Sequence, residues 1–321
     1  MTDYRSIRKA AIISIIFSAI HIIGAVIIIA APANAIEIMY GYKPDMVTDM
    51  PLFIPIYLYI FAFIFNIIAD VLIIKRISVY APFIISLISA ISVFTFANII
   101  ERIQTIIYAR LYGERPMVFY SSIIQVNDML FLITFAGFVI SISLSAVYLC
   151  LRKKEQLEEY RPSAAGLAIA AIVLISVYVI LLLTIILGQK QLMTYIDAPD
   201  ILLNVGFHFP AKSIFMLLVC AFDMICCAMI IKGKSVFKYS PFAVAVIYPI
   251  ARLIIQLVES RISDINVFAY NGTLYSYENF FTVFISIGVI MCYAASAVYT
   301  YVKKNYPEST EVGETYGSPD Y

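Results

Sequence analysis

The sequence is poor in charged residues. Asp, Glu, Lys and Arg make up 13% of its 321 residues, whereas 62% are hydrophobic and the mean hydropathy is +0.92. A soluble domain carries about 25% charged residues, because its surface must face water. The composition therefore excludes a soluble globular protein and indicates a chain whose outer surface faces lipid.

The sequence also lacks catalytic and metal-binding signatures. It has two histidines and 12 glycines, and no Gly-x-Ser-x-Gly, His-Glu-x-x-His or glycine-rich phosphate loop. His21 lies within an apolar run, where a hydrogen-bonded packing role is favoured over metal ligation. His208 lacks metal-ligand spacing to Asp197 and Asp200; these two carboxylates form a solvated turn or, less favoured, a site for Mg²⁺ and a lipid phosphate. We predict no catalytic residue, metal or cofactor, and no nucleic-acid partner.

Cysteines are absent from the predicted outer loops. All five lie inside apolar runs, at Cys150, Cys220, Cys226, Cys227 and Cys292. No disulfide framework is therefore expected.

Long apolar runs fill most of the chain. A helix needs about 20 apolar residues to cross the hydrocarbon of a bilayer. Eight runs qualify, at residues 10–31, 52–74, 79–100, 129–151, 164–188, 213–231, 241–258 and 280–302. They predict an all-α integral membrane protein with eight transmembrane helices, a multi-pass protein of the cell (plasma) membrane whose first partner is the lipid bilayer.

The first run has an alternative interpretation as a cleavable signal peptide. A basic start and Ala33-Asn34-Ala35 resemble a signal peptide and its cleavage site. Signal peptides have apolar regions of about 7–15 residues, whereas residues 11–30 contain no charge. Retention of this run as a membrane span is therefore favoured over cleavage.

The two halves of the chain resemble each other. Gly137-x3-Ser141-x3-Ser145-Ala-Val-Tyr148 returns as Gly288-x3-Cys292-x3-Ser296-Ala-Val-Tyr299, at a constant offset of 151 residues. Such self-similarity predicts a duplication. Four spans return the chain to its starting side, so the second repeat would enter the membrane in the same direction as the first. The repeats would therefore be parallel. Parallel repeats occur in transporters whose substrate sites lie where the halves meet.

This duplication divides the chain into four parts. We predict a first four-helix repeat over 1–152, a charged linker over 153–163 and a second four-helix repeat over 164–304. Residues 305–321 are acidic and contain Pro and Gly, a composition that cannot bury a core. They are expected to form a disordered cytoplasmic tail.

Basic residues predict the orientation of the spans. Short loops rich in Lys and Arg stay on the cytoplasmic side. With the N-terminus inside, 14 of the 22 Lys and Arg residues fall on that side, seven fall outside and Arg252 lies within a span. Both termini are therefore predicted to be cytoplasmic.

The longer outer loops, which begin at Glu101 and Glu259, are candidates for small hairpins. Asn271-Gly272 separates two tyrosine-containing segments, a strong signal for a two-residue turn. Gly113 lies at the corresponding place in the first half. The tyrosines of these loops either form an aromatic belt at the lipid headgroups, which is favoured, or bind a ligand.

Polar side chains within the spans are the candidates for function, because they are costly in lipid. Asp223 and Arg252 lie about 12 Å and about 16 Å from the inner ends of the sixth and seventh spans at 1.5 Å per residue. They are therefore expected to form an ion pair near the middle of the bilayer. Alignment of the halves places Asn66 opposite Asp223 and Phe94 opposite Arg252, so both charges are absent from the first half.

The remaining polar positions complete a predicted route. Asn98 aligns with Gln256, and Asp70 lies one turn from Asn66. The candidate residues of the ligand or ion pathway are Asp223, Arg252, Asn66, Asp70, Asn98 and Gln256. The charged pair is either a structural clasp, which would leave a stranded charge if one side were removed, or part of a substrate or proton pathway. Small residues at four-residue spacing predict close helix packing; they are Gly137, Ser141, Ser145, Gly288, Cys292 and Ser296.

Three functional hypotheses follow. The first is a secondary carrier of a small polar or charged solute, with a midplane site between the repeats. The second is a non-catalytic scaffold or accessory subunit that binds a membrane protein partner through helix faces, outer loops or tail. The third is a lipid-modifying enzyme, which would need a metal or nucleophile that the sequence does not show.

Overall fold

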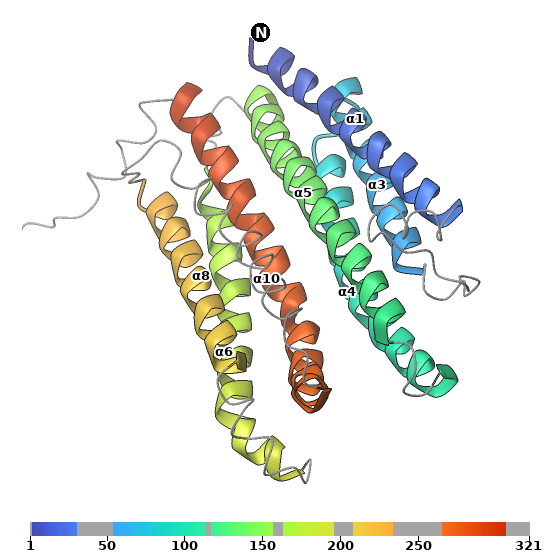
Figure 1. The fold of residues 1–321 in the computed structure, drawn as a ribbon. Coiled ribbons are helices and arrows are strands. Elements are labelled where there is room, and N and C mark those ends of the chain that lie inside the picture. The colour runs from blue at the N-terminus through green and yellow to red at the C-terminus, as the bar shows by residue number, and fades with distance from the viewer. Residues whose placement is uncertain are drawn as a thin grey trace, which may run out of the picture. The chain divides into compact units, whose positions relative to one another are not determined.

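The chain is helical throughout the part that the computed structural model describes, apart from short turns (Figure 1). The described residues are 2–30, 54–112, 117–156, 163–195, 208–233 and 265–305. Their helices are α1 (Thr2–Ala30), α3 (Ile54–Lys75), α4 (Ala81–Tyr112), α5 (Met117–Gln156), α6 (Ala165–Tyr195), α8 (His208–Ile231) and α10 (Ile265–Asn305).

Six of the described helices are long and apolar enough to cross a membrane. The spans are Tyr4–Ala30, Ile56–Lys75, Ile133–Gln156, Ala165–Thr184, Ile214–Ile231 and Val283–Asn305. The predicted third span is part of α4, whose described apolar stretch, Ala81–Phe96, is shorter. The predicted seventh span, 241–258, lies outside the described residues. The helices indicate a multi-pass membrane protein, and the count of eight stays a prediction.

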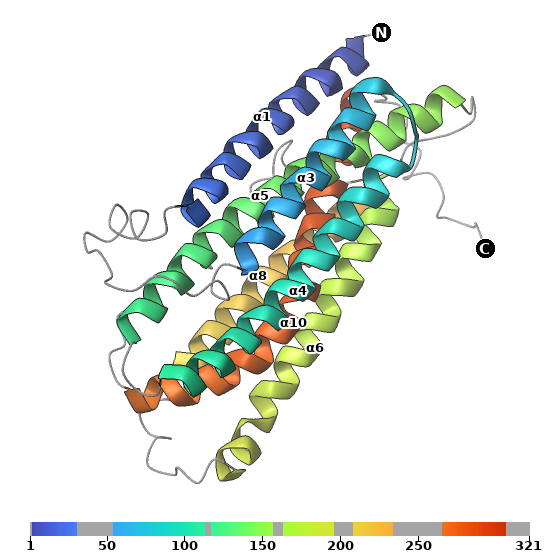
Figure 2. The same cartoon turned by 90° about the vertical axis from the view of Figure 1, so that its right-hand side faces the viewer.

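The chain divides into two compact units, Met1–Lys153 (unit 1) and Lys154–Tyr321 (unit 2). In unit 1, α3 packs between α1 and α4 (Figure 2). In unit 2, α6 packs against both α8 and α10. The predicted tail lies outside the described residues, except for Asn305 at the end of α10.

The α3–α4 connection is a short turn with a recognisable helix cap. Arg76 adopts a left-handed conformation with φ of 56°. Its N–H donates to the Ile73 carbonyl at 3.2 Å, and the Ile77 N–H donates to the Leu72 carbonyl at 3.3 Å. This Schellman pattern ends the helix by satisfying its last carbonyls. Gly233 ends α8 with a similar φ of 67°, the conformation that glycine adopts without steric cost.

Buried positions recur at the same spacing in α3 and α8. Numbers in α8 exceed those in α3 by 157, and the positions are Tyr59, Ala62, Phe63, Asn66, Ala69, Asp70 and Ile73 in α3, and Met216, Val219, Cys220, Asp223, Cys226, Cys227 and Ile230 in α8. The same difference relates Ile7, Ala11, Ser14, Ser18 and Ala25 of α1 to Ala164, just before α6, and to Ala168, Ala171, Ile175 and Leu182 of α6. The two units thus bury equivalent faces of these helices.

The predicted hairpin around Asn271-Gly272 is wrong, because α10 is continuous from Ile265 through this segment. An Asn-Gly pair forms a hairpin turn only if the two flanking segments pair as strands. A helix instead satisfies its backbone hydrogen bonds within the same segment. One glycine inside a helix costs only about 1 kcal/mol. In the first half, α4 continues to Tyr112 and α5 begins at Met117, while Gly113 lies outside the described residues.

Candidate functional site

Unit 1 buries one amide side chain and one carboxyl side chain, which lie one helical turn apart. Asn66 and Asp70 lie on the inner face of α3, and both are 0% exposed. None of their side-chain oxygen or nitrogen atoms has a hydrogen-bond partner among the described residues. The Ser14 hydroxyl of α1 lies beside the Asp70 carboxyl without completing a hydrogen bond of good geometry. The interior of unit 1 therefore contains polar groups that the packing of its described residues does not satisfy.

Gly137 of α5 brings the backbone of that helix against this polar face. A Cβ atom at Gly137 would lie 3.5 Å from Asn66 Nδ2, 2.8 Å from Phe63 Cε1 and 3.6 Å from Phe17 Cε1. Only a residue without a side chain allows α5 to approach α1 and α3 this closely. The predicted packing role of Gly137 thus places it beside the candidate residue Asn66.

His21 has a packing role, as expected from the sequence. Its Nδ1 atom lies 2.7 Å from the Phe17 carbonyl oxygen, and its ring stacks on Phe63 with centroids 5.3 Å apart. This ring nitrogen therefore has a partner one turn earlier in the same helix.

A hydroxyl pair joins α4 to α5. Ser86 Oγ and Ser141 Oγ lie 2.8 Å apart and both residues are buried, so Ser141 adds a hydrogen bond to its predicted packing role.

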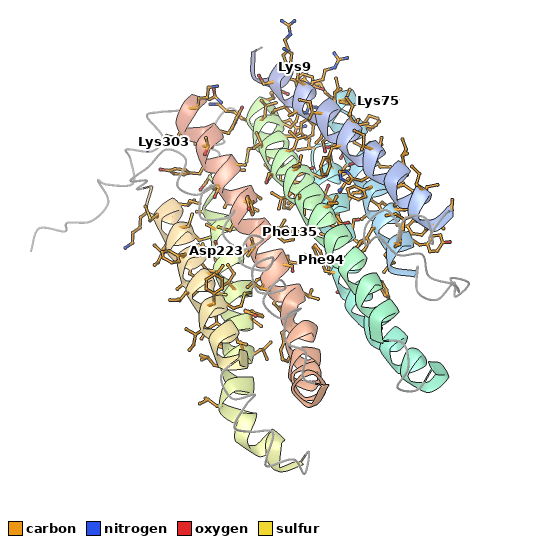
Figure 3. The ribbon with its side chains drawn as sticks, viewed as in Figure 1. Lys9, Lys75, Phe94, Phe135, Asp223 and Lys303 are labelled. Carbon is orange, nitrogen blue, oxygen red and sulfur yellow. The ribbon has the colours of Figure 1, made fainter. Side chains whose placement is uncertain are left out.

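Aromatic rings also join α4 to α5. The Phe94 ring lies 6.2 Å from that of Phe135 and 5.5 Å from that of Phe138, centroid to centroid (Figure 3). The position that aligns with Arg252 is thus part of an aromatic core in unit 1.

Unit 2 surrounds its buried carboxyl with thiols. Asp223, on α8 (Figure 3), is 0% exposed, and neither carboxyl oxygen has a hydrogen-bond partner among the described residues. Cys292 of α10 places its Sγ atom 4.0 Å from the Asp223 carbonyl oxygen, and the Asp223 carboxyl lies close enough to Cys220 to act electrostatically on its thiol. Within the described ranges, no group of three His, Cys, Asp or Glu side chains has the geometry of a metal site.

The two clusters occupy equivalent positions in their units. Asn66 corresponds to Asp223 and Asp70 to Cys227 at the difference of 157 residues. Gly137 corresponds to Gly288, where a Cβ atom would again lie 2.8 Å from a side chain, that of Ile175. Each unit therefore holds a polar or ionisable cluster at the same place in its helix packing, but with different chemistry.

Three predicted pathway residues are not described. Arg252 and Gln256 lie outside the described residues, and the side chain of Asn98 on α4 does too. The Asp223–Arg252 ion pair therefore stays a prediction. Conversely, the sequence pattern did not single out buried hydroxyl groups on other helices, at Ser14, Ser18, Thr134 and Ser286. Their only sequence signal is a hydroxyl residue within an apolar run, which is too common to single out.

The chemistry of these sites follows from their burial. An ionised carboxylate in a low-dielectric interior needs a counter-charge, hydrogen-bond donors or water. Asp70 and Asp223 lie in membrane-spanning segments, where such groups pair with one another or face a solute or ion pathway. These carboxyls are suited to hold a proton, a cation or a hydrogen-bond donor of a solute.

The six long apolar helices indicate a multi-pass membrane protein with acidic residues inside its candidate spans. Comparison of the chain with protein-family models, curated proteins and solved structures gives no match.

Proposed function

We propose that this protein is a secondary carrier of a small polar or charged solute. The observation that carries the proposal is the burial of Asn66, Asp70 and Asp223 in membrane-spanning helices without hydrogen-bond partners among the described residues. A chain that only needed to pack would gain stability from apolar residues at these positions, because unsatisfied polar groups are costly.

In this proposal the two units have different tasks. Asp223 binds a cationic group or a proton, and Arg252 supplies a counter-charge when the site is empty. Asn66 and Asp70 form a second polar station in unit 1, and Asn98 and Gln256 line the route. That the solute binds where the repeats meet remains part of the sequence-based prediction.

We further propose that the units are two parallel four-helix repeats. The matched burial of α1 with α6 and of α3 with α8 supports this. So does the direction of α8 and α10: the Tyr299 hydroxyl, near the end of α10, donates to the Gly233 carbonyl, just after the end of α8, at 3.0 Å. Because α8 and α10 end beside each other, the chain must cross back to the other side before α10 begins. The proposed additional span over 241–258 would provide this crossing.

Thiol labelling in native membranes tests whether water reaches Asp223. Cys220 and Cys227 flank Asp223 on its buried face and are 0% exposed, and maleimide requires a hydrated thiolate. A carrier must open this region during its cycle, so single-cysteine variants that keep Cys220 or Cys227 should react with a membrane-impermeant maleimide. Added solutes that slow the reaction would then be candidate substrates.

Matched controls lie on the opposite face of the same helix. Phe222 and Ile225 are 52% and 56% exposed on the surface of α8, so Phe222→Cys and Ile225→Cys place a thiol at the same depth facing lipid. These controls should remain unlabelled. If Cys220 and Cys227 react as slowly as the controls until detergent unfolds the protein, the interior is dry. The carrier proposal then fails in favour of a scaffold or accessory role.

A further inference from the structure

One end of unit 1 gathers basic side chains from three helices. We call it the basic end and define it by Lys9 of α1, Lys75 and Arg76 at the end of α3, and Arg152 and Lys153 near the end of α5. Lys9, Lys75 and Arg76 are exposed, and Figure 3 shows Lys9 and Lys75 at the same end of the unit. Clusters of this kind beside membrane spans attract anionic headgroups.

Aromatic side chains hold part of the basic end in place. The Arg76 guanidinium carbon lies 3.9 Å from the centroid of the Tyr4 ring, and Lys153 Nζ lies 5.1 Å from that of Tyr80. The Tyr4 hydroxyl donates to the carbonyls of Ile73 and Ile74 at 2.8 and 2.7 Å. These contacts restrict Arg76 and Lys153 before any anion arrives, which lowers the entropy lost on binding.

The Tyr148 hydroxyl lies one helical turn before Arg152 on α5. Tyr148 is 0% exposed, and its hydroxyl has no hydrogen-bond partner among the described residues. Arg152, Arg76 and Tyr4 lie close enough to act on it electrostatically, and the Arg152 guanidinium lies beside it without completing a hydrogen bond of good geometry. Both arginines only donate hydrogen bonds, so the proton of the Tyr148 hydroxyl needs an acceptor from elsewhere.

The equivalent place in unit 2 is built differently. Tyr299 corresponds to Tyr148 and Lys303 to Arg152 at a difference of 151, and Gly233 corresponds to Arg76 at a difference of 157. There the Tyr299 hydroxyl is satisfied, because it donates to the Gly233 carbonyl at 3.0 Å. Unit 2 thus pairs its tyrosine within the protein, whereas unit 1 has arginine in place of glycine and completes no hydrogen bond to its tyrosine hydroxyl among the described residues.

We propose that the basic end of unit 1 is a binding site for a phosphoryl group, with Arg76 and Arg152 as bidentate donors and the Tyr148 hydroxyl as a third donor from below. Arginine is the side chain whose planar fork matches phosphate oxygens. On binding, the Arg152 guanidinium turns toward the phosphoryl oxygens and uncovers the hydroxyl, while Arg76 keeps its place on the Tyr4 ring. The group comes from an anionic phospholipid or from free phosphate. This inference is independent of the proposed transport activity.

Lipid-selective fluorescence quenching tests the site in the full-length protein. The chain has no tryptophan, so a Tyr80→Trp variant carries one reporter at the basic end, and Ile231→Trp carries one at the end of α8 in unit 2. Both variants are reconstituted with brominated phosphatidylglycerol or brominated phosphatidylcholine. We expect brominated phosphatidylglycerol to quench the Tyr80→Trp fluorescence more strongly than brominated phosphatidylcholine does. The two lipids should quench the Ile231→Trp fluorescence more equally.

The decisive variant gives unit 1 the residues of unit 2. In Arg76→Gly with Arg152→Lys, the left-handed φ of 56° at residue 76 favours glycine, so the turn is retained. The preference for the anionic lipid should fall about tenfold, since the exchange removes one cation and replaces the bidentate fork of Arg152 by a single ammonium group. Tyr148→Phe should also lower the preference for the anionic lipid, and by more than Tyr299→Phe does.

Inorganic phosphate separates the two sources of the phosphoryl group. If the reporter prefers phosphatidylglycerol and phosphate does not compete, the ligand is a lipid headgroup. If phosphate changes the Tyr80→Trp emission in phosphatidylcholine alone, and the double variant abolishes this change, the ligand is free phosphate. Equal quenching by both lipids without a phosphate effect overturns the proposal, as does a preference that the double variant leaves unchanged.

Discussion

The thiol of Cys292 on α10 lies 4.0 Å from the carbonyl oxygen of Asp223 on α8. This contact packs the small-residue stripe of α10 against the helix that bears the buried carboxyl. In unit 1 the corresponding stripe residue, Ser141, bonds instead to Ser86 of α4 at 2.8 Å. Equivalent positions therefore serve different contacts in the two units, and several variants can be paired across them.

Replacing the predicted charged pair should abolish transport without unfolding the protein. Asp223→Asn introduces the residue found at the equivalent position, Asn66, and Arg252→Leu removes the predicted counter-charge. If Asp223 binds solute or a proton, the double variant loses uptake in proteoliposomes for any solute identified by protection of the thiols. Unchanged uptake by the double variant would contradict the carrier proposal.

Thermal stability of the single variants distinguishes a clasp from a pathway. A structural ion pair leaves a stranded charge when one partner is removed, which costs about 3–5 kcal/mol. Each single variant would then unfold well below the double variant. If the group serves transport instead, the single variants retain most of their stability and lose uptake.

Alanine at Gly137 and Gly288 should destabilise the helix packing. Either new Cβ atom would lie 2.8 Å from a side chain, and at Gly288 it would also lie 3.3 Å from the Ile175 backbone nitrogen. Overpacking of this kind costs about 1–3 kcal/mol, and Gly288→Ala should be the more severe because backbone atoms cannot turn aside.

Gly24 and Gly166 are the matched controls for these substitutions. Neither has an atom within 4 Å of a new Cβ, so alanine there should be neutral or stabilise by up to about 1 kcal/mol through helix propensity. Thermal unfolding in detergent compares all four variants. Equal effects at the crowded and open glycines would contradict the packing geometry.

Removing the hydroxyl of Tyr148 or Tyr299 should have opposite consequences for stability. Tyr299→Phe deletes a hydrogen bond to the Gly233 carbonyl and should cost about 1 kcal/mol. Tyr148→Phe removes a buried hydroxyl without a partner among the described residues, so it should be neutral or stabilising. Unfolding of both variants is measured without anionic lipid or phosphate, because a bound phosphoryl group would make Tyr148→Phe destabilising as well.

A double-mutant cycle should detect the bond between Ser86 and Ser141. Each single alanine variant leaves one buried hydroxyl without its partner, whereas the double variant removes both. Hydrogen bonds between membrane helices contribute on average about 0.6 kcal/mol, so the double variant should be less destabilised than the sum of the singles by about this amount. Additive effects would show that the two hydroxyl groups do not interact energetically.

The sequence by itself determined that this is a helical membrane protein. Apolar runs of span length are a local property, because lipid requires every backbone group to be satisfied within its own helix. The same reasoning located Asn66, Asp70 and Asp223, since a polar side chain within an apolar run can be identified without knowing its neighbours.

Only the tertiary structure decided which of these side chains lack hydrogen-bond partners among the described residues, and what surrounds them. Helix packing places Gly137 against Asn66, Ser141 against Ser86 and Cys292 against Asp223. It also decided that the Asn271-Gly272 segment is helical, although its local signal favours a turn. Contacts between helices depend on which faces meet, and residues distant in sequence set those faces, so no local pattern determines them.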